Sequence, residues 1–169
     1  MDYHDNEWGI PIHDDHKHFE YLLLETFQAW LSRYTILSKR ENFRQAFDNF
    51  DYKKIAQYTD KKIEELVINS WIIRHRGKIL AAIQNAQIFI NIQQTYGSRD
   101  TFIWKYTDNK IIDNKLTDYK NSPSKTELAD KISKDLKKLG MKFIWSTVMY
   151  AHLQATGQIN DHEISCWKH

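Results

Sequence analysis

The feature that most constrains the fold is a helical repeat of large apolar residues early in the chain. These residues recur at spacings of three and four, the period of one face of an α-helix. They are Phe19, Leu22, Leu23, Phe27 and Leu31. The pattern predicts an amphipathic helix that runs from Asp15 to about Arg33, with Asp14 or Asp15 as its N-cap.

Similar patterns predict helices along most of the remaining sequence. Only 5 Gly and 2 Pro are available to interrupt them, and no stretch has the alternation of a convincing strand. The expected helices cover residues 34–37, 40–47, 52–58, 61–69, 78–96, 98–104, 126–139 and 142–155. Residues 106–125 are expected to form a mobile loop without recognisable chemistry. We therefore predict an all-α protein.

Length and composition limit the class of protein. A chain of 169 residues is the size of one domain, and its single Cys excludes an intramolecular disulfide. Neither a signal peptide nor an apolar run of membrane-spanning length is present, which favours a soluble intracellular protein. Because 24 Lys and Arg nearly balance 22 Asp and Glu, a nucleic-acid partner requires that the basic residues be clustered.

Glu25 lies among apolar residues within the first predicted helix. A buried carboxylate needs a partner, a ligand or a proton, because its burial without one costs several kcal/mol. Glu25 is therefore a candidate ligand-binding acid. The alternative is a helix-edge Glu that reaches solvent or pairs with a Lys.

Cationic residues cluster where residues 60–96 are expected to form a helical hairpin. Arg74, His75, Arg76 and Lys78 flank the start of its second helix, where free backbone N–H groups bind anions. The cluster predicts a phosphate contact, although such a charge run also suits a solvated face. A second group of lysines, around Gly140, fits a solvated face better.

His162 and Cys166 have a spacing suited to zinc ligands. Residues four apart on a helix or tight turn lie on the same side, and imidazole and thiolate are ligands that zinc prefers. A structural zinc needs four ligands, however. His4 is the first additional candidate, followed by His169 or a water molecule.

Several ordered motifs together resemble the bacterial DNA-3-methyladenine glycosylase I family of the helix-hairpin-helix superfamily. The resemblance extends over almost the whole chain. The matching segments are residues 3–9 (YHDNEWG), Glu25 with 28–29 and 31–32, residues 39–44 (KRENFR), 72–79 (IIRHRGKI), 142–143, 154–155, and 160–162 with Cys166.

The resemblance implies an all-α glycosylase domain over residues 1–169, with the hairpin at about 60–96 and a smaller lobe formed by residues 1–14 and 125–169. It implies base-excision repair, in which 3-methyladenine is flipped out of alkylated double-stranded DNA and released by hydrolysis. Glu25 matches the catalytic pocket acid. Tyr3, Trp8 and Gln28 match residues around the base, and the two rings can stack on its cationic form. No Schiff-base lysine is implied, so the expected enzyme does not cleave the DNA strand.

The same resemblance assigns DNA and metal contacts. The hairpin residues Arg74, His75, Arg76 and Lys78 would hold a phosphate, and Trp30 with Leu31 would plug the space left by the flipped nucleotide. Three matched residues are ligands of a structural zinc that ties the chain ends together. They are His4, His162 and Cys166. The family's fourth ligand, a Cys, precedes the first residue of this sequence.

Four departures from the family pattern leave an alternative open. Trp30, Trp71 and Trp145 stand where the family has Gly, and Arg33 stands where it has a stacking Trp. The alternative is a catalytically impaired member that binds DNA or damaged sites without base excision. For either function we expect a monomer in the bacterial cytoplasm, with no membrane partner.

Overall fold

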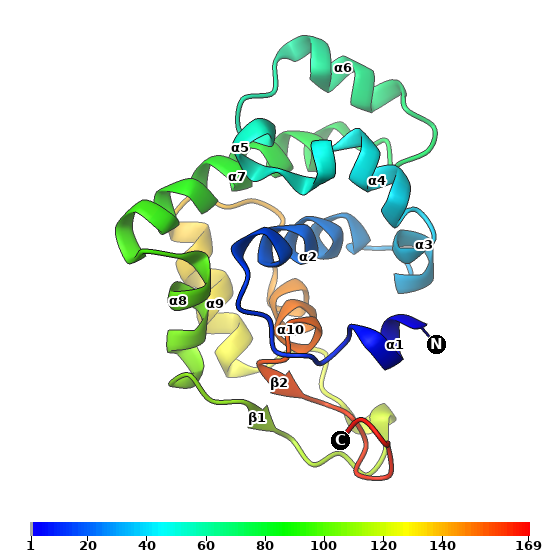
Figure 1. The fold of residues 1–169 in the computed structure, drawn as a ribbon, viewed down its shortest axis with the longest axis vertical. Coiled ribbons are helices and arrows are strands. Elements are labelled where there is room, and N and C mark those ends of the chain that lie inside the picture. Colours follow the sequence, from blue (N-terminus) through cyan, green and yellow to red (C-terminus); the bar gives the residue numbers. More distant parts are fainter. Residues whose placement is uncertain (1) are drawn as a thin grey trace.

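The computed structural model describes residues 2–169, and almost all of its regular structure is helical (Figure 1). Its α-helices are α1 (Asp2–Asn6), α2 (Asp15–Gln28), α3 (Arg33–Leu37), α4 (Arg40–Ala46), α5 (Tyr52–Ile55), α6 (Asp60–Ile68), α7 (Arg76–Tyr96), α8 (Arg99–Trp104), α9 (Glu127–Lys138) and α10 (Ser146–Ala155). Short 3₁₀ helices are η1 (Asp48–Phe50), η2 (Lys105–Thr107) and η3 (Tyr119–Asn121). No helix within residues 2–169 is both long and apolar enough to cross a membrane.

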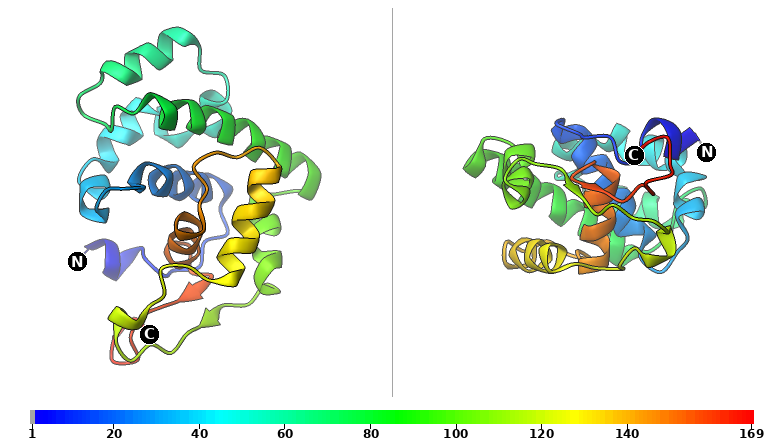
Figure 2. Two further views of the ribbon diagram at one scale, coloured as in Figure 1. Left: turned by 180° about the vertical axis from the view of Figure 1, so that it is seen from behind. Right: turned by 90° about the horizontal axis from the view of Figure 1, so that it is seen from below.

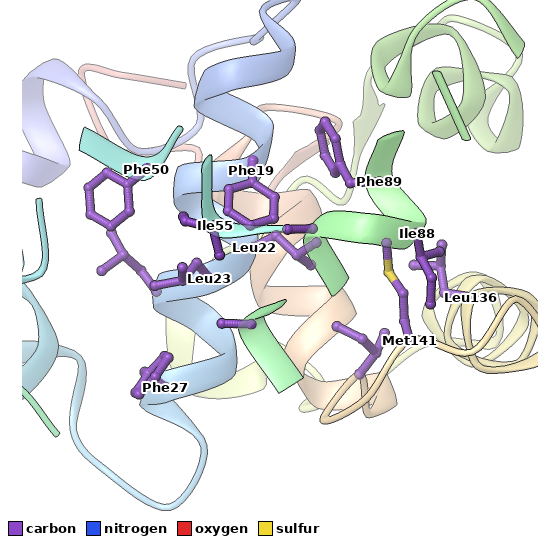
Figure 3. Packing of buried hydrophobic residues seen from close by; sticks show 14 of the residues in the cluster. Phe19, Leu22, Leu23, Phe27, Phe50, Ile55, Ile88, Phe89, Leu136 and Met141 are labelled. Carbon is purple, nitrogen blue, oxygen red and sulfur yellow. The ribbon is translucent and has the colours of Figure 1, made fainter. Parts of the chain in front are cut away.

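Helix α2 is the centre of the molecule, as its apolar pattern predicts. Asp14 caps it by accepting a hydrogen bond of 2.7 Å from the Lys17 backbone N–H. Every residue from His18 to Phe27 is buried, because α2 contacts α3, α7, α8, α10 and η1. In Figure 3 its apolar side chains lie in one buried cluster with residues from η1, α5, α7, α9 and the segment after α9. The other cluster members labelled there are Phe50, Ile55, Ile88, Phe89, Leu136 and Met141.

The long helix α7 joins α5 and α6 to the rest of the molecule (Figure 2). It packs against α5, α6 and α8, and it also contacts α2. Helices α9 and α10 pack on each other, and α10 in turn packs on α2. The C-terminal region is therefore part of the main helical body, in addition to lying beside the N-terminal segment.

Two short strands correct the expectation that the chain has none. Strand β1 (Ile112–Asp113) pairs in parallel with β2 (Ile159–Asn160), in the register Ile112 with Ile159. Backbone N–H groups of Ile112 and Asn114 donate to carbonyls on either side of Ile159, at 2.9 and 3.1 Å. Strands of two residues are too short to produce an alternating sequence pattern. Their pairing holds residues 106–125 against the C-terminal segment.

Helix α2 ends before the predicted limit of Arg33. Residues 28–31 form a type II turn, in which Ala29 has φ −45° and ψ 120° and Trp30 has φ +72°. The turn is closed by a hydrogen bond of 2.6 Å from the Leu31 N–H to the Gln28 carbonyl. The apolar period continues through Leu31, so the sequence pattern alone does not reveal this break.

Candidate active site

One cavity, of about 350 Å³, lies where residues from both ends of the chain meet, and we call it the larger cavity to distinguish it from a smaller one at the end of α2. The larger cavity receives residues from α1 and the turn after it, α3, the segment around η3, α10 and the segment after β2. The lining residues are Tyr3, His4, Trp8, Arg33, Tyr119, Ser122, Gln154 and Asp161. Aromatic rings and polar groups thus surround one space, as recognition of a heteroaromatic ligand requires.

An ion-pair network fixes the segment that carries Tyr3 and Trp8. The Arg40 guanidinium donates hydrogen bonds to Glu7 at 2.7 and 2.8 Å and to Glu20 of α2 at 2.8 Å. The Tyr21 hydroxyl also donates to Glu7, at 3.1 Å. Because Glu20 is buried, these contacts hold α1 firmly on α2.

A smaller cavity of about 200 Å³ lies at the end of α2. Its lining includes Glu25, Gln28, Trp30 and Leu31, together with residues of α10. Trp30 is 94% exposed and Leu31 is 39% exposed, so the turn presents Trp30 fully and Leu31 partly to solvent. Such an apolar tip has the shape required of a DNA wedge.

Arg33 connects the two cavities through its guanidinium group. Its Nη2 lies 3.6 Å from Glu25 Oε1, and its Nη1 donates a hydrogen bond of 3.3 Å to the Tyr3 hydroxyl. The guanidinium carbon also lies 5.8 Å from the centre of the Tyr3 ring. Arg33 is therefore directed into the site, and it is the partner that the buried Glu25 carboxylate needs.

Burial controls the protonation of this group of residues. It raises the pKa of Glu25 above its usual value, and the Arg33 charge opposes this shift. Burial also raises the pKa of Tyr3 to about 12, again against the effect of Arg33. Tyr3 thus remains a neutral phenol at physiological pH, available both to stack and to hydrogen-bond.

Asp161 is a second buried carboxylate of the site, and it lines the larger cavity. It accepts hydrogen bonds from Gln154 at 2.6 Å, from Asn114 at 2.7 Å and from Ser122 at 3.1 Å. The Tyr150 hydroxyl also donates to it. Four donors therefore satisfy the hydrogen-bonding capacity of a carboxylate that is only 4% exposed. The network joins α10 to the segment around η3.

The cationic hairpin residues point in different directions. Arg74 is exposed, whereas Arg76 pairs with Glu64 of α6. His75 caps α7, because its Nδ1 accepts a hydrogen bond of 3.1 Å from the Lys78 N–H. The helix N-terminus and Arg74 together retain the chemistry of an anion site.

The prediction that Lys78 contacts DNA is wrong. Its ammonium group is buried, and it donates hydrogen bonds of 2.8 Å to the Phe27 carbonyl and 2.7 Å to the Ala29 carbonyl. These carbonyls lie at the end of α2, where helical partners are lacking. Lys78 instead fixes the position at which α2 ends and the Trp30 turn begins.

His4, His162 and Cys166 converge although they lie at opposite ends of the chain. Their ligand atoms all lie within 4.8 Å of one another, and the Cys166 Sγ is 3.8 Å from His4 Nε2 and from His162 Nδ1. Ligand atoms around a tetrahedral zinc are roughly 3.5 Å apart, given its bond lengths. Asp5 contacts the other nitrogen of His4, at 2.8 Å, an arrangement common behind zinc-binding histidines.

His169 is not placed to complete this cluster. Its Nε2 lies 3.4 Å from Asp113, and its Nδ1 lies 3.1 Å from the His162 carbonyl. Burial and the neighbouring His4 lower the pKa of His162, which favours the neutral imidazole that metal binding requires. The three converging residues therefore fit a zinc ion chemically.

The sequence model of the methyladenine glycosylase family matches residues 1–169. The chain belongs to this family. Two similar relatives are DNA-3-methyladenine glycosylase 1 of Escherichia coli, 42% identical over 97% of this chain and 88% of the relative, and DNA-3-methyladenine glycosylase of Haemophilus influenzae, 43% identical over 98% and 90%. A solved structure of a variant of 3-methyladenine DNA glycosylase I in complex with 3-methyladenine has a TM-score of 0.96 at 35% identity, covering 98% of this chain and 89% of that one.

Membership confirms the predicted family and the all-α glycosylase fold. Within this fold, Tyr3 and Trp8 share the larger cavity, whereas Glu25 and Gln28 line the smaller one. The sequence predictions did not include the residues that enclose the larger cavity from the C-terminal side, which are Tyr119, Ser122, Gln154 and Asp161. The only available signal was that Gln154 and Asp161 lie inside matched family motifs. Residues 106–125, expected to lack chemistry, supply the other two.

Proposed function

We propose that this protein is a DNA repair glycosylase that releases 3-methyladenine from alkylated double-stranded DNA. The observation that carries the proposal is the Tyr3, Trp8 and Glu25 group at paired cavities, in a chain 42% identical to a DNA-3-methyladenine glycosylase. Both named relatives come from bacteria, so we propose that the protein acts in the bacterial cytoplasm. We also propose that it acts as a monomer.

The reaction breaks the bond between the deoxyribose C1′ and N9 of the base. Methylation at N3 makes the base cationic, so the electron pair of this bond passes readily to the leaving base. A water oxygen then bonds to C1′ and loses its proton to solvent, leaving an abasic sugar. The enzyme therefore needs to hold the flipped base more than it needs to protonate it.

The roles of the pocket residues follow from their chemistry. The Tyr3 and Trp8 rings can stack on a cationic purine, with cation–π contributions of roughly 0.5–2 kcal/mol per contact. The Glu25 carboxylate complements the positive charge and can accept hydrogen bonds from the base, as Gln28 can through its amide. Among residues 2–169 no lysine lines either cavity, and the proposed hydrolysis needs no Schiff base and no strand cleavage.

DNA binding is assigned to exposed groups near these cavities. Trp30 and Leu31 would fill the space left by the flipped nucleotide. Arg74 and the free N–H groups at the start of α7 would hold a backbone phosphate, in a helix-hairpin-helix arrangement of α6 and α7.

We also propose a structural zinc at His4, His162 and Cys166. Such an ion would tie the N-terminal segment that carries Tyr3 and Trp8 to the end of the chain. Zinc takes no part in the chemical step of this scheme, which depends on the residues of the two cavities.

The direct test is product analysis on methylated duplex DNA. We expect free 3-methyladenine in the supernatant and intact strands carrying abasic sites, with much less base from Glu25→Ala. Salt-sensitive DNA binding without base release would contradict the proposal and favour the catalytically impaired alternative. Strand nicking without added base or heat would contradict the monofunctional assignment.

A further inference from the structure

Arg33 lies at the boundary of the two cavities. It lines the larger cavity, while Glu25 belongs to the lining of the smaller one. The two terminal nitrogens of Arg33 face the Tyr3 hydroxyl, at 3.3 Å, and the Glu25 carboxylate, at 3.6 Å. A base that enters the larger cavity therefore meets the Arg33 cation before it meets the Glu25 anion.

The contacts that hold Arg33 in this place are weak for an arginine. Charge-assisted hydrogen bonds between guanidinium and carboxylate are usually 2.7–2.9 Å long. At 3.6 Å the pair with Glu25 is longer than a hydrogen bond, and the bond to Tyr3 is made to a neutral hydroxyl. The Arg33 side chain is 32% exposed, and Arg33 is the first residue of α3. Rotation of its own torsions can therefore move the guanidinium into solvent while the backbone stays in place.

We propose that Arg33 is a specificity-determining residue, the resident counter-ion of Glu25 that a cationic purine displaces when it binds. This inference rests on the proposed function. Two cations cannot both gain fully from one buried carboxylate, because their mutual repulsion offsets the attraction that each experiences. The incoming cation must either replace Arg33 or bind beside a like charge.

The displacement of Arg33 from Glu25 affects the binding of cationic and neutral bases differently. A cationic base gains the attraction of Glu25 only after the Arg33–Glu25 pair has separated. A neutral purine gains little from the Glu25 charge, so its affinity depends mainly on stacking with Tyr3 and Trp8. Arg33 thus reduces the preference of this pocket for cationic lesions over normal adenine.

The test compares two small ligands that differ in charge. The permanently cationic 3,9-dimethyladenine and the neutral 9-methyladenine both carry a methyl group in place of the sugar. Each is titrated into the wild-type protein, Arg33→Met and Arg33→Gln at pH 7.5, with binding followed by NMR. Lys53→Met, which removes an exposed positive charge from α5, is the matched control.

We expect both Arg33 variants to bind the cation about tenfold more tightly than wild type, with less than a twofold change for the neutral ligand. Lys53→Met should match wild type. Adding Glu25→Gln to Arg33→Met should remove the gain, because the attraction comes from that carboxylate.

Unchanged or weaker binding of the cation by both variants would overturn the proposal. An equal gain for both ligands would also overturn it, since Arg33 would then only obstruct the pocket. Failure of the proposed function is a separate result, because binding of a free base requires no excision. A tenfold gain without base release from DNA would support the displacement of Arg33 while contradicting the glycosylase.

Discussion

Trp30 occupies a backbone conformation that is unfavourable for its residue type. It takes the third position of a type II turn with φ +72°, a conformation that favours glycine. For other L-residues the left-handed region costs roughly 1–2 kcal/mol. The side chain is 94% exposed, so packing within residues 2–169 offsets little of that cost.

We therefore predict that Trp30→Gly raises the free energy of unfolding by about 1 kcal/mol. Urea unfolding followed by circular dichroism measures the change. Trp145→Gly is the matched control, because Trp145 is also exposed but has φ −85°. The control should be neutral or destabilising, and an equal stabilisation of both variants would contradict the turn-strain explanation.

The sequence identifies residues of the site better than it identifies their orientations. An acid within an apolar helical pattern marks Glu25 as a candidate, because its burial follows from the period of α2, and the family resemblance adds the role of pocket acid. The bond of Arg33 to Tyr3 and the buried position of Lys78 depend on contacts between residues far apart in the chain. No local pattern encodes those contacts, and a cluster of cations looks the same whether its members face solvent or the core.

At the scale of elements, the contact between α2 and α10 contains two buried histidines. His18 and His152 have ring centres 5.7 Å apart, beside the buried Arg99. Burial lowers the pKa of His152 well below its usual value, and the charges of His18 and Arg99 lower it further. The pKa of His18 is also lowered, again chiefly by burial.

This contact predicts that the protein loses stability in acid. Below about pH 6.5 the unfolded chain protonates both histidines while the folded chain resists protonation, so the free energy of unfolding falls as pH falls. The loss is about 1.4 kcal/mol per pH unit for one fully suppressed site. Above pH 6.5 the pair contributes no pH dependence.

Unfolding midpoints between pH 7.5 and 5.0 test this prediction with His152→Leu. Neither ring nitrogen of His152 has a hydrogen-bond partner within residues 2–169, so an apolar replacement should be tolerated. We expect the variant to have a flatter pH profile than wild type. An unchanged slope would show that other groups cause the acid sensitivity.

Arg74, in the connection between α6 and α7, is the basis of a prediction about DNA binding. Arg74→Gln should weaken binding to any DNA duplex and reduce the slope of log K against log salt by about one. Lys134→Gln removes an exposed charge from α9 and is the control. A slope that is unchanged by Arg74→Gln would exclude a phosphate contact at this residue.

Most helices could be predicted from sequence, because the apolar period persists through them. Strands β1 and β2 could not, since two residues carry no period and their pairing joins segments more than forty positions apart. The end of α2 was also missed, because the apolar period continues through Leu31 while the turn at Trp30 and the Lys78 ammonium end the helix.

At the scale of the whole molecule, residues from both ends of the chain line the larger cavity. Figure 1 shows α1 and the segment after β2 at the same end of the molecule. Tyr3 and Trp8 precede the first long helix, and Asp161 and His162 follow the last one. The cavity therefore exists only when both ends are docked. Contacts between His4, His162 and Cys166 lie at this junction.

We predict that the protein, purified without chelator, contains zinc at this junction. Removal of the ion should lower the stability by about 2 kcal/mol, which corresponds to roughly 6 °C in Tm. Metal analysis and thermal unfolding with and without EDTA measure both effects. Cys166→Ser should abolish the response to EDTA and Ser165→Ala should retain it. Less than about a tenth of an equivalent of zinc would contradict the assignment.

The most direct test of the account is the rate of 3-methyladenine release from methylated duplex DNA, with enzyme in excess. We expect release by the wild-type protein and a decrease of about 10–100-fold for Glu25→Gln, because the pocket then lacks its buried negative charge. Glu65→Gln, which removes an exposed negative charge from α6, should retain the wild-type rate. Equal rates for Glu25→Gln and wild type, or no release above the enzyme-free control, would contradict the account.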